Sequence, residues 1–152
     1  MATHSTHDNG ERAGAEIVYG AEDCRRYSVA LLEELGFPKG VLPLVDLVEY
    51  GRVRATGFVW MKQKAASEHY LEATKTPVSY AAEVTAYVEK GKMKRMSGVK
   101  SKPLLFWLPV TEMSIEDKAA GGREKIYFKT ALGIGKSLPA TAFMTAEEKE
   151  KN

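Results

Sequence analysis

The residue types needed for ester hydrolysis are present in this chain, but the histidine among them is isolated. A serine hydrolase needs a nucleophile, a general base within hydrogen-bond reach and an acid that orients the base. His69 is the only histidine outside residues 1–14, and the sequence has no G-x-S-x-G pattern. An ester hydrolase would therefore use His69 as its base, with Ser79 and Asp46 as nucleophile and acid. The alternative is a surface or structural role for His69, which is common for a single histidine.

The sequence gives no reason to expect a metal ion or a cofactor. Its one cysteine, Cys24, excludes an internal disulfide and a thiolate zinc site. His4 and His7 lie in a polar N-terminal stretch, where solvated side chains are the simpler interpretation. Residues 133–137 (GIGKS) end like a phosphate-binding loop, but the preceding glycine spacing is wrong.

A set of basic residues near the ends of predicted strands suggests binding rather than catalysis. The basic residues are Lys62, Lys64, Lys90, Lys92, Lys94, Arg95, Lys100 and Lys102, and the aromatic residues expected beside them are Phe58, Trp60, Phe106 and Trp107. If the strands are neighbours, these cations form one rim at an apolar interior. Such a rim suits an amphiphile with an anionic head, or an anionic membrane surface.

Two other interpretations of these residues stay open. Lysines at a sheet edge prevent aggregation through strand pairing, and aromatic residues most often fill a core. Binding of single-stranded nucleic acid is less favoured, because it requires aromatic side chains exposed on one sheet face.

Short strands separated by turns must position these residues. Alternating apolar and polar residues predict a strand that begins near residue 83, with turns at residues 90–92 and 97–98. Residues 104–110 (LLFWLPV) are apolar at both parities, which predicts a central strand covered on both faces, with an edge or bulge at Pro109.

One amphipathic helix is expected before the strands. Over residues 21–35, Cys24, Leu31 and Leu35 fall on one stripe, and Gly36 is placed to end the helix. The predicted fold is therefore mainly β: an antiparallel barrel, or a barrel-like sandwich, with one N-terminal amphipathic helix packed on it.

Length and charge set further bounds. The 152 residues predict one domain at 15–144, a disordered tail at 1–14 and a charged tail at 145–152. The net charge of +2 is too balanced for an obligate nucleic-acid binder. No apolar run approaches the roughly 20 residues of a membrane span. We expect a cytoplasmic monomer, with peripheral membrane attachment as an option.

Several sequence words resemble a plant family catalogued as domain of unknown function 538. They are residues 36–44 (GFPKGVLPL), 57–64 (GFVWMKQK), 78–80 (VSY), 83–91 (EVTAYVEKG), 96–100 (MSGVK), 126–130 (IYFKT) and 137–143 (SLPATAF). The resemblance implies a β-rich barrel with a leading helix and a role in stress or development, but no agreed catalytic motif. It also implies a similarity to lipid-binding proteins of the bactericidal/permeability-increasing type. A role related to chlorophyll or to esters is a further implication of the resemblance.

Three hypotheses for function follow. The first is non-catalytic binding of an amphipathic or anionic, lipid-like ligand, such as a lipid, a chlorophyll-like pigment or a membrane head group. The second is an ester hydrolase acting on a lipid or pigment ester with His69 as base. The third is a protein-interaction scaffold with a filled core, against which a roomy internal cavity would count.

Overall fold

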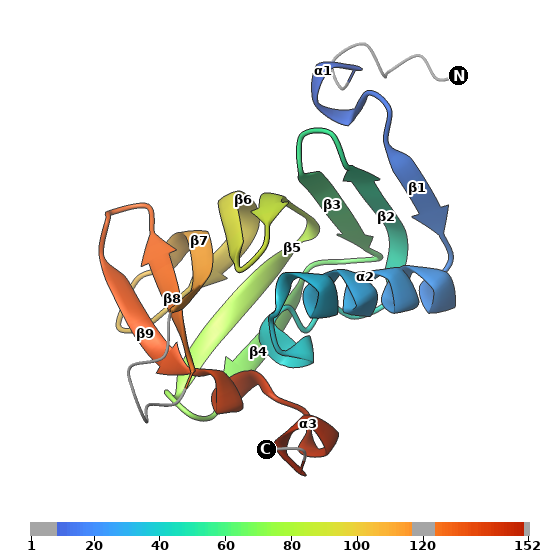
Figure 1. The fold of residues 1–152 in the computed structure, drawn as a ribbon. Helices are drawn as coiled ribbons and strands as arrows, with labels where there is room; N and C mark the ends of the chain where they lie inside the picture. The colour runs from blue at the N-terminus through green and yellow to red at the C-terminus, as the bar shows by residue number, and fades with distance from the viewer. Residues whose placement is uncertain (1–8, 117–123, 151–152) are drawn as a thin grey trace.

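One antiparallel sheet dominates the computed structural model, which describes residues 9–116 and 124–150 (Figure 1). The strands are β1 Glu16–Tyr19, β2 Leu47–Val53, β3 Phe58–Gln63, β4 Ser67–Leu71, β5 Thr76–Glu89, β6 Lys92–Ser101, β7 Leu108–Glu116, β8 Lys125–Thr130 and β9 Gly135–Pro139. The helices are α1 Asn9–Arg12, α2 Ala21–Leu35 and α3 Ala146–Glu150, with short 3-10 turns η2 Lys39–Val41 and η3 Ala140–Phe143.

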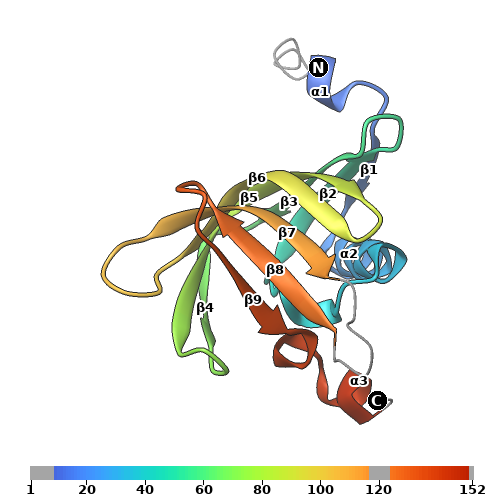
Figure 2. The same ribbon diagram turned by 60° about the vertical axis from the view of Figure 1, so that its left-hand side comes forward.

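The sheet is strongly curved but it does not close. Its strand order is β1-β2-β3-β5-β6-β7-β8-β9, and β4 pairs with β5 beside this path. Strands β5 to β9 curl around one end of the molecule, whereas β1 to β3 extend away from it (Figure 2). The prediction of a mainly antiparallel β fold with an N-terminal helix is confirmed. The barrel is open, because β1 and β9 are not paired within the part of the chain that the structure describes.

Helix α2 covers the sheet at the β1–β3 end. Its buried residues are Cys24, Ser28, Leu31, Leu32 and Leu35, which recur at helical spacing. Gly36 ends the helix in the left-handed conformation, at a φ of 92°, and its N–H bonds back to the last turn. The predicted helix boundaries are therefore confirmed. The leucines pack against Tyr50, Val59 and Met61 in the main core.

Strand β6 stays in the sheet where the sequence predicted a turn at residues 97–98. Arg95 and Gly98 have φ values of 51° and 89°, and the pairing registers with β5 and β7 shift there. Such irregularities insert a residue and bend the strand. As a result Met93, Met96 and Val99 all face the core at intervals of three. The predicted turn was wrong because a glycine with positive φ serves a bulge as readily as a turn.

The apolar run at residues 104–107 is not a central strand. Strand β7 begins only at Leu108, which pairs with Ser101, so residues 102–107 form the loop between β6 and β7. Leu104, Leu105 and Phe106 are 87%, 78% and 74% exposed. The prediction failed because this segment extends past the end of the sheet, where no second layer covers it.

The predicted tails are only partly within the described residues. Of the N-terminal stretch, residues 9–12 form α1, and His4 and His7 lie outside the described part. Of the C-terminal stretch, residues 146–150 form α3.

Candidate ligand-binding cavity

The curled end of the sheet encloses a cavity of about 260 Å³. Strands β4 to β9 contribute to its walls, together with residues from η2, η3 and the connecting loops. The lining residues are Val41, Leu71, Thr74, Thr76, Val78, Tyr80, Val99, Ser101, Pro103, Leu108, Val110, Met113, Phe128, Thr130, Ile134, Gly135, Lys136, Leu138 and Phe143. Most of these side chains are apolar, so the cavity favours an apolar guest.

Strand alternation explains why these residues meet. In β5, Thr76, Val78 and Tyr80 share one parity and line the cavity. Val78 and Tyr80 pair with Ser101 and Val99 of β6, so both strands turn the same face inward.

Tyr80 places one polar group among these apolar walls. The residue is 4% exposed, and its hydroxyl has no hydrogen-bond partner within residues 9–116 and 124–150. Burial raises the pKa of the phenol above its ordinary value, so the group is a neutral donor and acceptor at physiological pH. A buried tyrosine hydroxyl usually finds a partner. This one is therefore available to a bound molecule.

The other polar groups of the lining differ in availability. Thr74 and Thr76 hydrogen-bond to each other, at 3.0 Å between their Oγ1 atoms. Thr130 Oγ1 donates to the Ile134 carbonyl, at 2.9 Å. Ser101 and Lys136 make no side-chain hydrogen bond or ion pair within the described residues, and Lys136 is exposed at the rim. Cationic and hydroxyl groups are thus available at the opening.

The residues considered for ester hydrolysis do not converge. His69 pairs with Val78 and Ser79 pairs with Glu68, so the His69 and Ser79 side chains lie on opposite faces of the sheet. Asp46 is exposed just before β2, and its carbonyl accepts a hydrogen bond from the Lys64 N–H. Across the described ranges no side-chain hydrogen bond joins any two of the three residues. The geometry of a triad is therefore missing.

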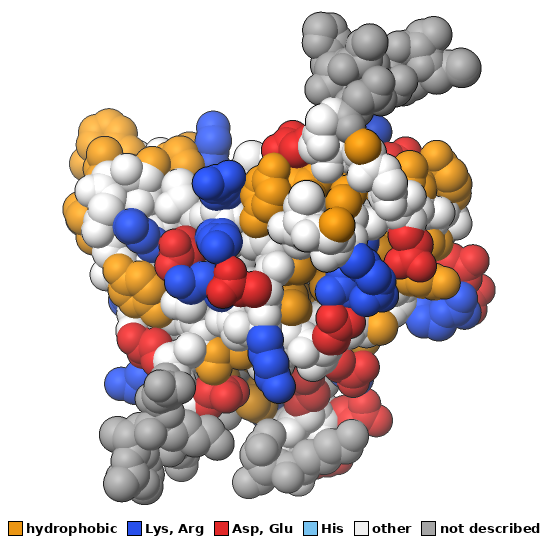
Figure 3. All heavy atoms as spheres, turned by 45° about the horizontal axis from the view of Figure 1, so that its top comes forward, with side chains coloured by type: hydrophobic (Ala, Val, Ile, Leu, Met, Phe, Trp, Pro, Cys, Tyr) orange, Lys and Arg blue, Asp and Glu red, His pale blue; other side chains and the backbone are white. Residues whose placement is uncertain are grey.

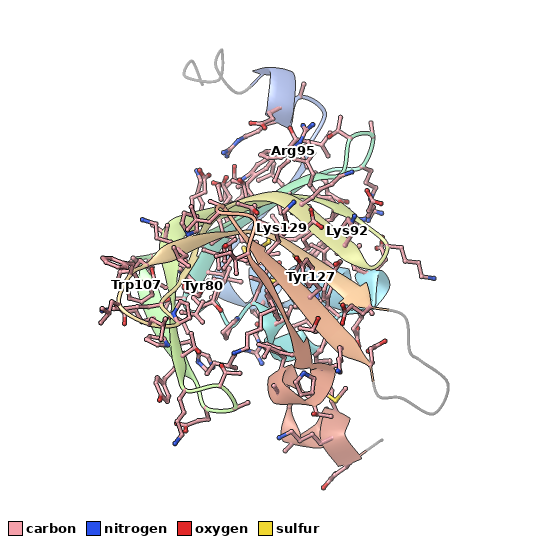
Figure 4. All side chains as sticks on the ribbon, turned by 90° about the vertical axis from the view of Figure 1, so that its left-hand side faces the viewer. Tyr80, Lys92, Arg95, Trp107, Tyr127 and Lys129 are labelled. Atoms are coloured by element: carbon pink, nitrogen blue, oxygen red, sulfur yellow. The ribbon has the colours of Figure 1, made fainter. Side chains whose placement is uncertain are left out.

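The basic residues are divided between two regions instead of forming one rim. Lys90 and Lys92 flank the β5–β6 turn, where the Gly91 N–H bonds to the Leu35 carbonyl at the end of α2. Lys100 and Lys102 lie at the other end of β6, up to about 30 Å away along the strand at roughly 3.3 Å per residue. Figure 4 shows Lys92 and Trp107 at opposite ends of this part of the molecule.

Three of the six basic residues far from the cavity are paired with acids. Lys94 Nζ lies 2.9 Å from Glu89, and Lys92 Nζ lies 3.8 Å from Glu112. Lys62 Nζ lies 3.5 Å from Glu49, and the Arg95 guanidinium lies 5.4 Å from the centre of the Tyr87 ring. Basic and acidic side chains accordingly alternate over the face seen in Figure 3.

Phe58 and Trp60 belong to a separate small cluster, not to the cavity. They pack with Val53, and the Arg12 guanidinium lies 4.5 Å from the centre of the Trp60 ring. Trp60 Nε1 donates to Glu49 Oε2 at 2.7 Å. Gly51, opposite Trp60, makes room for the indole ring, because a Cβ at Gly51 would collide with it.

The lining residue with the clearest polar role, Tyr80, was missed by the sequence-based reasoning. Its parity with Val78 and Val84 could have identified it as inward-facing. No pattern of residue types predicts that the space beside it is hollow. Within the described residues no group of three or more His, Cys, Asp and Glu side chains could hold a metal ion.

Comparisons with known proteins complete the description of the site. None of the helices within the described residues is both long and apolar enough to cross a bilayer. No curated protein and no solved structure matches the chain. One family model does match, over residues 28–144, which include every residue that lines the cavity. The chain therefore belongs to the family described as Protein of unknown function, DUF538.

Proposed function

We propose that this protein binds one amphipathic, lipid-like molecule without chemical turnover. The apolar part of the ligand lies in the cavity, and its polar or anionic head lies at the opening near Lys136. The observation that carries the proposal is the cavity of about 260 Å³, whose apolar walls surround the unpartnered hydroxyl of Tyr80. Apolar pockets with a few convergent polar groups are the usual form of small-molecule sites.

The size of the cavity favours a narrow ligand. A volume of about 260 Å³ is just below the range of roughly 300–1,000 Å³ for drug-sized ligands. A single acyl chain suits such a space better than the wide ring of a chlorophyll-like pigment. Acyl chains are therefore the first ligands to test.

The other two hypotheses receive less support. An ester hydrolase needs a base beside its nucleophile, and His69 and Ser79 lie on opposite faces of the sheet. A scaffold with a filled core is opposed by the cavity. The cytoplasmic location stays a prediction.

Titration with a fluorescent fatty acid tests the proposal, using the full chain and two tryptophan variants. Val78→Trp puts an indole into the cavity, and we expect it to weaken binding of the probe by about tenfold or more, because the guest loses its space. Ser79→Trp is the matched control, since the neighbouring side chain points to the outer face. We expect this control to bind the probe like the unmodified chain.

Two measurements make the test decisive. Thermal unfolding establishes that both variants are folded, and chromatography of the bound probe as an acyl ester establishes whether it is recovered intact. Failure of the unmodified chain to bind fatty acids of any chain length would overturn the proposal. So would equal binding by both folded variants, or steady hydrolysis of the ester.

A further inference from the structure

A cluster of exposed apolar side chains stands at the opening of the cavity, and we call it the apolar lip. It consists of Leu104, Leu105 and Phe106 in the β6–β7 loop, with Leu132 and Ile134 in the β8–β9 turn. The last two are 68% and 63% exposed, and the first three are more so. Contiguous exposure of large apolar residues is unusual on a soluble surface and marks an interaction site.

The two segments of the apolar lip belong to one structural unit. The Ala131 N–H donates to the Pro109 carbonyl at 2.9 Å, which ties the β8–β9 turn to the base of the β6–β7 loop. Pro103 of the loop, Leu108 at the start of β7 and Ile134 of the turn all line the cavity. The apolar lip therefore borders the proposed site, and Ile134 belongs to both.

The shape of this region favours insertion over docking into a groove. The β6–β7 loop projects beyond the neighbouring strands (Figure 2). Trp107 lies at this tip, with Tyr80 further inward (Figure 4). In Figure 3 hydrophobic side chains gather at the corresponding corner of the molecule. A convex apolar protrusion can insert into a lipid bilayer. A protein partner would instead need a groove of complementary shape.

The charges around the apolar lip suit an anionic bilayer. Residues 98–111 and 129–139 contain lysines but no Asp or Glu. Lys100, Lys102 and Lys136 form no ion pair within the described ranges. Lys102 Nζ lies 5.7 Å from the centre of the Trp107 ring. Tryptophan beside lysine is a typical pair at the interface between lipid and water.

We propose that the apolar lip inserts into the interface of an anionic membrane. Leu104, Leu105 and Phe106 enter the acyl region, while Lys100 and Lys102 contact the head groups. Insertion seats the opening of the cavity on the bilayer. If the proposed ligand binding holds, on which this last step rests, an acyl chain then passes between leaflet and cavity without crossing water.

Vesicle binding by the full chain tests this docking surface, with Trp107 as the reporter. The vesicles contain phosphatidylcholine, with or without phosphatidylserine, and a brominated phosphatidylcholine serves as quencher. The chain has two tryptophans, and Trp60 is only 1% exposed in its separate cluster. We expect quenching on vesicles with phosphatidylserine, and we expect Trp107→Phe to abolish it.

Two sets of substitutions separate the apolar and the charged contributions. Leu104→Ser, Leu105→Ser and Phe106→Ser together should weaken vesicle binding by about tenfold or more. Their control is Ile17→Ser, Tyr19→Ser and Val45→Ser, exposed apolar residues near β1 and β2, away from the lip.

Lys100→Glu with Lys102→Glu should weaken binding to the anionic vesicles by a similar factor. Lys64→Glu with Lys90→Glu is the matched control, because both lysines are exposed elsewhere.

The outcomes distinguish this proposal from the one on ligand binding. The triple serine variant should still bind the fatty-acid probe in solution, and Val78→Trp should still bind vesicles. Vesicle binding unchanged by the triple serine substitution, or an unquenched Trp107, would overturn membrane docking. A dimer in sedimentation that the same variant dissociates, without vesicle binding, would also overturn it and assign the lip to a second copy of the chain.

Discussion

The two ends of the sheet bury similar apolar side chains, but one end is covered by a helix and the other encloses a cavity. At the β1–β3 end, Leu31, Leu32 and Leu35 of α2 pack over the sheet in the main core and leave a smaller hollow of about 150 Å³ beside Leu32. At the β5–β9 end no helix within the described residues fills the interior, and Val99 and Val110 face a cavity. An inward-facing apolar strand therefore fixes which side is inside, but the covering element decides whether that inside is filled.

The largest expected difference between the two ends concerns truncation of a leucine. Leu31 is 2% exposed and packed on all sides, so Leu31→Ala should lower the free energy of unfolding by about 3–5 kcal/mol. Leu138 borders the cavity and already lacks neighbours on that side. Leu138→Ala should therefore lower the free energy of unfolding by about 2 kcal/mol or less. Urea unfolding of both variants measures the losses. Equal losses would mean that the cavity end is packed as tightly as the helix end.

A bulge of β6 gives the next test, because it bends the strand around the cavity. Gly98 has a positive φ, and a Cβ at this position would collide with the Glu83 carbonyl. Gly98→Ala should therefore lower the free energy of unfolding by about 2–3 kcal/mol. Gly133 also has a positive φ, of 80°, but open space around it. Gly133→Ala should therefore cost only about 1 kcal/mol.

Binding of the fatty-acid probe extends this comparison. Gly98→Ala should weaken it and Gly133→Ala should leave it nearly unchanged. Unfolding midpoints and probe titrations check both expectations, and the reverse order of the two variants would contradict the role of the bulge.

A third test uses the pH dependence of stability at the end of the sheet that α2 covers. The Arg52 guanidinium donates to both carboxylate oxygens of Glu34, at 3.0 and 2.7 Å, and this holds the pKa of Glu34 below its ordinary value of 4.5. A lowered carboxyl pKa contributes stability above pH 4.5, which is lost as the pH falls through the folded-state pKa. Glu34 is half exposed, so screening limits the contribution to about 1 kcal/mol.

Replacement of the carboxylate makes this contribution measurable. Glu34→Gln should be less stable than the unmodified chain near pH 7, and the difference should shrink as the pH falls below 4.5. Thermal unfolding across this range provides the measurement. A difference that stays constant with pH would show that the ion pair between α2 and β2 contributes nothing through ionisation.

The smallest expected effect is loss of one hydroxyl in the cavity. Tyr80→Phe removes a buried group without a partner in the described residues, so the free energy of unfolding should change by less than about 0.5 kcal/mol. Affinity for a fatty acid should fall about threefold to tenfold, as expected for one hydrogen bond. Tyr50→Phe is the control at the filled end, where the hydroxyl interacts with Arg52. It should leave that affinity unchanged, and an identical response of both variants would exclude a specific role for Tyr80.

The sequence was informative where one periodicity dominated. Apolar spacing and Gly36 predicted α2 with its boundaries, because a helix stripe and a C-terminal glycine have few alternative explanations. The antiparallel strands followed from alternation in the same way. Both features depend on local geometry, which residue order encodes directly.

The candidate site was harder to predict, for two physical reasons. An apolar run such as residues 104–107 has the same composition whether it lies within a sheet or projects from it. The basic residues were expected in one rim, but their grouping depends on the register of β6 against β5 and β7, which two irregularities shift. Hollowness is a property of the whole assembly of side chains, so no single segment reveals it.

Cys24 offers a way to time the motions of this molecule. It is the only cysteine of the chain, it is fully buried on the inner face of α2, and its thiol donates to the Val18 carbonyl at 3.3 Å. Burial also raises the pKa of the thiol, which suppresses its reactivity while the helix is docked. A thiol reagent can therefore label the protein only during excursions that lift the helix. The rate at which Cys24 is labelled can be measured with and without a fatty acid. A lower rate with the fatty acid would show that occupying the cavity stabilises the docking of α2 at the other end of the sheet.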